Sequence, residues 1–408
     1  MTRADADAPR APLRERKFFR MDEHRENQIK AYKMFSTPAD GERDQSTAIY
    51  LRGMMDAEID LLPPTVKTGF SRLDKITGGL PIGLTILMAP SSTGKTTLAL
   101  QLADQIATSG RDVIFFSLEQ STLDLMSKSL SRYISRQNDA PPLTAYKIKY
   151  TKPQDRTPEE QAAIDKAIAE YTEDTGGRLC IVECDLKYTY QDICDFLLDA
   201  DVGYMTRTKT KPLVIIDYLQ LLYTPEKTQT RRDQIDEVTI ALRILARNQH
   251  IPILCLASVN SESRLQPLAA DSAKESTDTG YRADLTLGLQ YSIMDDNTRL
   301  EMEYGNYTTQ AGKNGSIINP FLNPQQGNKP IRDAIIKAEK EHQTREITLV
   351  SLKNRDAADG LTRFKYRTDR DRFDEILTPA QRMEEKRIKN AAEEAKIDAW
   401  LYEQARGN

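Results

Sequence analysis

The sequence lacks the features that would place a protein in a membrane or outside the cell. Its longest apolar run, Leu84–Ala89, is far shorter than the roughly 20 residues of a membrane-spanning helix. Only four of its 408 residues are cysteine, so no disulfide framework is expected. The first 20 residues are charged and contain proline, without the apolar centre of a signal peptide. We therefore expect a cytoplasmic protein with no membrane segment.

An excess of charge of one sign is also missing. The chain has 57 Lys and Arg against 61 Asp and Glu, a net charge of −4. This balance gives no bulk sign of nucleic-acid binding, so any DNA site has to be a local cluster of basic residues. Hydrophobic residues make up 39% and charged residues 29% of the chain, which is polar but sufficient for a buried core.

Histidine is scarce as well, which argues against a zinc site. The three histidines, at positions 24, 250 and 342, are not close in sequence to Cys180, Cys184 or Cys194. We interpret these cysteines, which lie in or beside an expected strand, as small buried hydrophobic residues.

Composition divides the chain into three parts. Residues 1–66 form a charged N-terminal extension with linker helices, and residues 379–408 form a charged C-terminal helix. Residues 67–378 read as one large domain, interrupted by a polar insertion at 292–345. The helices expected outside the regular part of this domain are Asn27–Phe35, Ser46–Ile59, Ile331–Glu341 and Pro379–Gln404.

Within residues 67–378, short apolar runs are interspersed with helical stretches. The runs scarcely alternate between apolar and polar residues, which is typical of strands covered on both faces. We therefore expect an α/β domain in which a mostly parallel sheet is flanked by helices. The expected strands are Leu84–Ala89, Val113–Leu118, Leu179–Val182, Leu213–Ile216, Ile253–Ala257, Leu285–Leu289 and Glu346–Leu352, and the expected helices are Leu98–Ala107 and Leu123–Ile134.

The segment Ala-Pro-Ser-Ser-Thr-Gly-Lys-Thr-Thr matches the phosphate-binding P-loop, except that alanine replaces the first glycine. A strand is expected before it and a helix after it, which makes the alternative, a chance Gly-Lys-Thr turn, the weaker interpretation. Backbone N–H groups around Gly94 would wrap the phosphates of ATP, at the positive end of the helix dipole. Lys95 would reach the β- and γ-phosphates, and the Thr96 hydroxyl would bind Mg²⁺. The nucleotide-binding residues expected here are Ala89, Pro90, Ser91, Ser92, Thr93, Gly94, Lys95, Thr96 and Thr97.

Two acidic residues that follow expected strands can complete this site. Asp217 comes directly after a buried strand, where α/β proteins bind ligands, and we expect it to hold Mg²⁺ through water. Glu119 follows another strand in the same way and is placed to orient and deprotonate an attacking water. The alternative for each residue is a helix N-cap or a surface acid.

Several further segments occur in the order that is found in DnaB-type replicative helicases. They are Thr68-Gly-Phe-Ser-Arg-Leu-Asp-Lys-Ile-Thr-Gly-Gly79, Phe116-Ser-Leu-Glu-Gln-Ser121, Ile215-Ile-Asp-Tyr-Leu-Gln220, Lys274-Glu-Ser-Thr-Asp278 with Ala283-Asp284, and Lys353-Asn-Arg355. Over roughly Lys67 to Ile376, without the insertion, the chain resembles the C-terminal motor domain of that family. The resemblance implies a RecA-like P-loop ATPase core, in which alanine at the first glycine position is common.

The resemblance also implies roles for individual residues. It makes Glu119 the catalytic glutamate and Asp217 the Mg²⁺-associated aspartate. It makes Lys353 and Arg355 a pair supplied by the neighbouring subunit of a hexameric ring, with Arg355 as the arginine finger. Without the resemblance, the two residues read as surface cations at a strand end.

The chain departs from the family pattern in two places. Leu256-Ala-Ser-Val-Asn-Ser261 stands where the family usually has Leu-Ser-Gln-Leu-Asn-Arg, so Ser258 replaces the glutamine that senses the γ-phosphate. Serine is shorter and has no amide, which puts the coupling between hydrolysis and DNA movement in question. The family's N-terminal helical domain, which interacts with primase, has no counterpart in the resemblance.

A ring motor of this type is expected to hold single-stranded DNA mainly by its phosphates, through loops that face a central channel. The best candidates are Lys227, Arg231 and Arg232, in the loop after Ile-Asp-Tyr-Leu-Gln, and Arg264 is a weaker one. The alternative is a solvated basic loop.

These observations favour an ATP-dependent, homohexameric DNA helicase that translocates 5′-to-3′ on single-stranded DNA during replication. Its candidate partners are a loader or a primase. The polarity and the ring follow from the resemblance alone. The alternative is a RecA-like ATPase that acts as a nucleotide-dependent switch or assembly scaffold, which Ser258 and the acidic net charge favour. A recombinase-like filament is a third interpretation.

Overall fold

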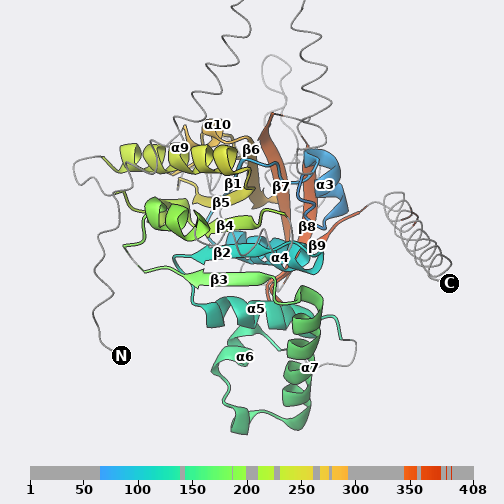
Figure 1. Cartoon of the computed structure of the whole chain (residues 1–408). Coiled ribbons are helices and arrows are strands. Elements are labelled where there is room, and N and C mark those ends of the chain that lie inside the picture. The colour runs from blue at the N-terminus through green and yellow to red at the C-terminus, as the bar shows by residue number, and fades with distance from the viewer. Residues whose placement is uncertain are drawn as a thin grey trace, which may run out of the picture. The chain divides into compact units, whose positions relative to one another are not determined.

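The structure is a computed structural model that divides into two compact units, Met1–Pro63 and Pro64–Asn408. The residues described lie in the second unit (Figure 1). They are 65–137, 143–185, 187–198, 210–224, 230–260, 267–274, 278–292, 344–355 and 360–377, with Met383 and Arg387. The helices expected at 27–35, 46–59 and 331–341 lie outside these residues, as does all of 379–404 except Met383 and Arg387.

A central sheet in the order β3-β2-β4-β5-β1-β6-β7-β8-β9 organises the described residues. The six strands β1 to β6 run parallel, and β7 to β9 add an antiparallel extension. The strands are β1 (Leu84–Ala89), β2 (Val113–Ser117), β3 (Leu179–Glu183), β4 (Leu213–Asp217), β5 (Ile253–Ser258), β6 (Leu285–Tyr291), β7 (Thr344–Asn354), β8 (Leu361–Arg367) and β9 (Arg372–Glu375). All seven expected strands are confirmed, whereas β8 and β9 were not expected.

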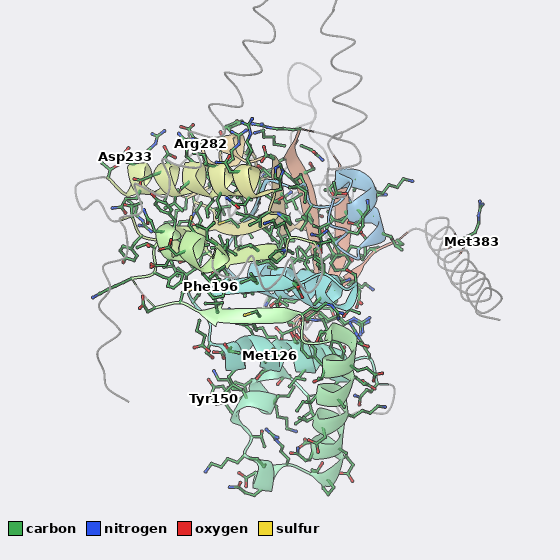
Figure 2. All side chains as sticks on the ribbon, viewed as in Figure 1. Met126, Tyr150, Phe196, Asp233, Arg282 and Met383 are labelled. Atoms are coloured by element: carbon green, nitrogen blue, oxygen red, sulfur yellow. The ribbon has the colours of Figure 1, made fainter. Side chains whose placement is uncertain are left out.

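Helices cover both faces of this sheet. Residues of α4 belong to one buried cluster and residues of α9 to the other, so each of these two helices lies on its own face. Helices α5, α6 and α7 extend beyond β3, at the edge of the sheet (Figure 1), and Figure 2 labels Met126 on α5 and Tyr150 on α6. The helices are α3 (Ser71–Thr77), α4 (Lys95–Thr108), α5 (Thr122–Ile134), α6 (Ala145–Tyr150), α7 (Pro158–Thr175), α9 (Arg231–Gln249) and α10 (Thr279–Arg282). The two helices expected within the domain correspond to α4 and α5.

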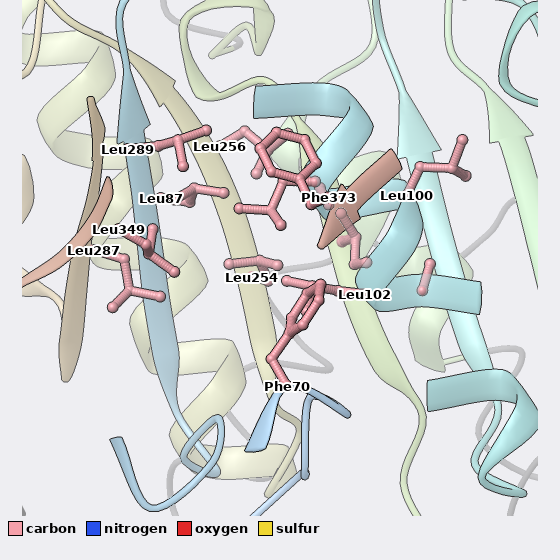
Figure 3. Close-up of a cluster of buried hydrophobic side chains, with 14 of the residues drawn as sticks. Phe70, Leu87, Leu100, Leu102, Leu254, Leu256, Leu287, Leu289, Leu349 and Phe373 are labelled. Carbon is pink, nitrogen blue, oxygen red and sulfur yellow. The ribbon is translucent and has the colours of Figure 1, made fainter. Parts of the chain in front are cut away.

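Strand β1 shows why the expected strands are almost continuously apolar. All six of its side chains are buried, because α4 covers one face of the sheet and α9 the other. Leu87 belongs to the cluster under α4 (Figure 3), whereas Ile86 and Met88 belong to the cluster under α9. A strand that is buried on both faces has no position at which a polar side chain reaches water.

The cysteines agree with their interpretation as small hydrophobic residues. All four are free thiols, Cys255 is buried within β5, and Cys184 and Cys194 pack against the cluster under α9. Within the ranges that the structure describes, no group of three or more His, Cys, Asp or Glu residues could hold a metal ion. None of the described helices is long and apolar enough to cross a membrane.

A buried ion pair ties α5 to α4. Arg132 Nη2 lies 2.6 Å from Asp104 Oδ2, and both side chains are at most 2% exposed. Ser129 and Tyr171 also donate to the Asp104 carboxylate, at 2.9 and 3.0 Å. Arg132 donates through Nη1 to the backbone carbonyl of Asp371, in the turn between β8 and β9. This pair therefore connects the helix that follows the P-loop with the antiparallel extension.

Replacing Arg132 with alanine should lower the free energy of unfolding by about 3–5 kcal/mol, because Asp104 would keep a buried charge without its partner. Urea denaturation followed by circular dichroism measures the loss. The matched control is Arg136→Ala on the same helix segment, whose pair with Asp174 is 45% and 44% exposed. The control should change the free energy of unfolding by less than about 0.5 kcal/mol. Equal losses for the two variants would contradict the prediction.

Candidate functional site

The P-loop leaves the carboxyl end of β1 and leads directly into α4. Gly94 is the N-cap residue of α4 and has a left-handed backbone, with φ of 90°. Ser92 is left-handed too, with φ of 68°, although it carries a side chain. Within the loop, Thr93 Oγ1 donates to the carbonyl oxygen of Pro90 at 2.8 Å. The loop therefore turns its backbone back on itself at the start of a helix, which is the geometry that binds phosphate.

Two aromatic rings of the antiparallel extension lie against this loop. Tyr366 of β8 and Phe373 of β9 are stacked, with ring centroids 4.2 Å apart and ring planes 3° apart. A Cβ atom on Gly94 would lie 2.7 Å from Tyr366 Cε1 and 2.9 Å from Phe373 Cζ. Only glycine fits under these rings, so the ring pair fixes one side of the loop.

Polar contacts join the same extension to the P-loop. Arg345, at the start of β7, donates through Nη1 to the carbonyl oxygen of Ser92 at 2.7 Å. Thr97 Oγ1 lies 3.4 Å from Asp371 Oδ1 and 3.5 Å from the Tyr366 hydroxyl. None of Arg345, Tyr366 and Asp371 was expected from the sequence, because they are about 250 or more residues away from the loop that they contact.

Four of the expected catalytic and binding residues meet at one edge of the sheet. Strands β2, β4, β5 and β1 are consecutive neighbours and parallel, so Glu119, Asp217, Ser258 and Lys95 all follow or end strands on the same side. Lys95 Nζ donates to Ser258 Oγ at 3.2 Å and lies 4.7 Å from the centroid of the Tyr218 ring. Ser258 thus contacts the P-loop lysine directly.

The charges at this edge affect each other. Burial lowers the pKa of the Lys95 amine, and the neighbouring charges of Asp217 and Glu119 oppose that change. Burial raises the pKa of the Asp217 carboxyl, while a hydrogen bond from Thr96 and the charge of Lys95 act against the rise. Lys95 and Asp217 therefore favour each other's charged form within a buried site.

The expected Mg²⁺ ligands have suitable chemistry. Asp217 is fully buried, and neither of its carboxylate oxygens has a hydrogen-bond partner at ordinary distance among the described residues. A buried carboxylate of this kind requires a cation or an ordered water. The Thr96 hydroxyl is close enough to influence Asp217. Hydroxyl and carboxylate oxygens are what Mg²⁺ prefers, so Thr96 and Asp217 fit the ion.

A buried glutamine braces Ser258. The Gln220 side chain accepts from the Ser258 backbone N–H at 3.1 Å and donates to the Ser258 carbonyl at 3.2 Å. This role was not expected from the sequence, although Gln220 closes the motif Ile-Asp-Tyr-Leu-Gln. The backbone carbonyl of Gln220 accepts from Arg231 at the start of α9. The chain after β4 is thereby connected to the end of β5.

Lys353 and Arg355 lie at the opposite edge of the sheet. Strand β7 runs antiparallel to β6, and Asn354 pairs with Leu285, the first residue of β6. Lys353 Nζ donates to the carbonyl oxygen of Ala283 at 2.7 Å, and Arg355 Nη1 lies 3.3 Å from Asp284 Oδ1. Neither cation is near the P-loop of its own chain.

A β-bulge sets the direction of these two cations. Thr286 pairs with Lys353 and Leu287 pairs with Ser351, so Leu352 is an extra residue in β7. A bulge re-aims the side chains beside it. Here Lys353 shares the face of Thr286, on which α9 and α10 lie.

The basic residues expected to bind DNA are only partly described. Lys227 and Arg264 lie outside the described residues. Arg231 donates to the carbonyl of Gln220, as noted above. The Arg232 side chain is 59% exposed and lies 3.7 Å from Asp278 Oδ2. Arg231 and Arg232 open α9, one strand away from the P-loop.

The family profile described as "DnaB-like helicase C terminal domain" matches residues 65–317, more than half of the chain. The chain belongs to this family. The DnaB-family match includes the P-loop, Glu119, Asp217 and Ser258 and ends before Lys353 and Arg355.

Curated DnaB relatives share sequence over about half of the chain. The Replicative DNA helicase DnaB of Geobacillus stearothermophilus is 28% identical over 246 residues, 56% of this chain and 47% of that protein. The protein of the same name from Buchnera aphidicola subsp. Baizongia pistaciae is 30% identical over 202 residues, 48% of this chain and 39% of that protein. The match thus spans less than half the length of these relatives.

Solved structures support the DnaB-type fold. One of them, an isolated ATPase domain, superposes with a TM-score of 0.59 at 17% identity, covering 82% of this chain and all of that one. A second, "The Structure Of A DnaB-Like Replicative Helicase And Its Interactions With Primase", gives a TM-score of 0.57 at 17% identity, covering 88% and 76%. At this identity the likeness shows the fold, a RecA-like arrangement.

Replacing Gly94 with alanine should weaken nucleotide binding by at least about tenfold, or 1.4 kcal/mol, because the new Cβ would collide with the rings of Tyr366 and Phe373. Titration of a fluorescent ATP analogue measures the affinity. Gly110→Ala is the matched control, since Gly110 also has a left-handed backbone, with φ of 98°, but nothing within 4 Å of the added Cβ. The control should bind nucleotide normally. Equal affinity for both variants would show that the ring pair does not fix the loop.

Proposed function

We propose that this chain is the motor of an ATP-dependent DNA helicase, which works as a homohexamer and moves 5′-to-3′ along single-stranded DNA during replication. Membership of the DnaB family and the RecA-like fold support the motor. The observation that carries the proposal is the separation of the two catalytic groups. The P-loop site and the Lys353–Arg355 pair lie at opposite edges of one sheet, so a complete site needs two copies of the chain.

The residues of one subunit bind ATP and activate water. Lys95 binds the β- and γ-phosphates, and the backbone of the P-loop wraps them. Thr96 and Asp217 would hold Mg²⁺, which supplies positive charge to the phosphates when it is bound. Glu119 orients the attacking water and accepts its proton. Ser258 holds the amine of Lys95, to which it already bonds at 3.2 Å.

The neighbouring subunit completes the site. Its Arg355 guanidinium stabilises the charge that develops on the γ-phosphate, with its Lys353 beside it. Strand β1 has six residues, so the two edges of the sheet are about 17 Å apart. A side chain of Arg355 cannot cover that distance within its own subunit.

Two further aspects of this function concern partners and location. One of the two solved structures above is named for its interactions with primase, and we propose that a primase or a loader is a partner of this chain too. We place the protein in the cytoplasm, where its four free thiols would stay reduced.

Arg355→Ala should lower the turnover number for ATP by about 10³ or more while ATP binding stays intact, as expected for an arginine finger supplied in trans. The measurement is steady-state ATPase activity together with nucleotide titration. Mixing Arg355→Ala subunits with Glu119→Gln subunits should restore part of the activity, because some interfaces then carry both wild-type groups. Mixtures that contain Lys95→Ala in place of wild-type chains provide a dead-subunit control. Loss of ATP binding in Arg355→Ala would refute the assignment in trans.

Strand displacement decides between the motor and its alternative. The purified chain should separate a forked duplex with ATP and Mg²⁺, and single-stranded DNA should stimulate its ATPase activity. ATP hydrolysis without strand separation, with or without added loaders, would instead support a nucleotide-dependent switch.

Arg232→Ala should weaken single-stranded DNA binding and reduce the slope of log affinity against log salt by about one, because one phosphate contact is lost. Fluorescence anisotropy at several salt concentrations measures the slope. Lys166→Ala is the control, since Lys166 is 62% exposed on α7, away from α9. Its slope should equal that of the wild type. An unchanged slope in Arg232→Ala would remove Arg232 from the DNA site.

A further inference from the structure

The edge of the sheet opposite the P-loop carries a cluster of one carboxylate and three cations. We call it the Asp284 cluster, made of Asp284, Arg243, Lys353 and Arg355. Arg355 Nη1 and Arg243 Nη2 lie 3.3 and 3.5 Å from the same oxygen, Asp284 Oδ1. Lys353 bonds backbone carbonyls instead, among them that of Ala283. Two arginines thus share one acceptor atom.

The Asp284 carboxylate is held in place from the other side. Its Oδ2 accepts from the backbone N–H of Leu84 at 3.0 Å, and its own N–H donates to the carbonyl of Leu84 at 2.8 Å. The missing side chain of Gly83 makes room, because a Cβ there would lie 2.6 Å from Oδ2. Asp284 is therefore fixed to the first residue of β1 and cannot follow an arginine that moves away.

The two arginines differ in how they are anchored. Arg243 projects from the middle of α9, a helix of 19 residues, and its side chain is 36% exposed. Arg355 follows the end of β7, and its side chain is 44% exposed. A guanidinium that turns to a phosphate outside the subunit gives up its carboxylate, and Arg355 is the one at the end of its element. If Arg355 turns away, Arg243 still lies beside Oδ1 and keeps the carboxylate paired.

We propose that Asp284 is the resting partner of Arg355 and that Arg243 is a positioning residue that makes Arg355 easier to release. The proposal rests on the proposed function, in which Arg355 acts on ATP bound by the neighbouring subunit. Asp284 and the γ-phosphate compete for Arg355, and Arg243 competes with Arg355 for Asp284. Charge at position 243 should therefore raise the fraction of time that Arg355 spends at the phosphate.

Arg243→Gln keeps most of the side chain but removes its charge, so Arg355 would become the single arginine on Asp284. The turnover number for ATP should fall about two- to fivefold, the range of a partly exposed ion pair. The KM for ATP should stay unchanged, because α9 does not supply the P-loop. Arg243→Lys should restore the turnover number. Arg247→Ala, an exposed arginine one turn further along α9, is the matched control and should behave as the wild type.

A double-mutant cycle separates this competition from a purely structural role. In an Asp284→Asn background the carboxylate charge is gone, so Arg243→Gln should change the turnover number by less than about 1.5-fold. An unchanged turnover number in Arg243→Gln alone, or an equal loss in both backgrounds, overturns the proposal. Arg355→Ala tests the proposed function separately. If Arg355→Ala leaves turnover intact, the arginine-finger assignment fails, whatever the cycle shows.

Discussion

Strand β1 is the constraint on which the rest of the domain depends. It pairs in parallel with β5 on one side and β6 on the other, and all six of its side chains are buried. A strand held in this way cannot shift without disrupting the core on both faces. Its carboxyl end carries the P-loop, and its first residue, Leu84, is bonded to Asp284. Both charged sites are thus attached to the most rigid element of the sheet.

The antiparallel extension turns a phosphate loop into a walled site. Strand β7 brings Arg345 to the carbonyl of Ser92, and β8 and β9 place two stacked rings on Gly94. The buried pair Arg132–Asp104 then joins the turn between β8 and β9 to α4. One wall of the nucleotide site is therefore built by residues that follow the insertion in sequence. Folding of the parallel core alone would leave the P-loop open on that side.

The parallel core and the phosphate loop could be predicted from the sequence because each leaves a local signal. Strands buried on both faces read as apolar runs, and the P-loop needs a glycine, a lysine and a threonine in a fixed order. Strand β8 gave no such signal, since its sequence Leu-Thr-Arg-Phe-Lys-Tyr-Arg places basic residues between its buried ones. The brace from Gln220 to Ser258 depends on strands that are adjacent only in the fold. Pairings of this kind cannot be read from a single sequence.

The extra residue in β7 determines to which layer of the domain the two cations belong. In a regular strand, residues two apart share a face, so Leu349, Ser351, Lys353 and Arg355 would all point toward the side of α4. Leu349 does point there and is buried in that cluster. Because Leu352 is surplus, Lys353 and Arg355 change sides and meet Asp284 and Arg243 under α9. A single inserted residue thus converts two charges that would disrupt one hydrophobic layer into an exposed, cationic rim of the other.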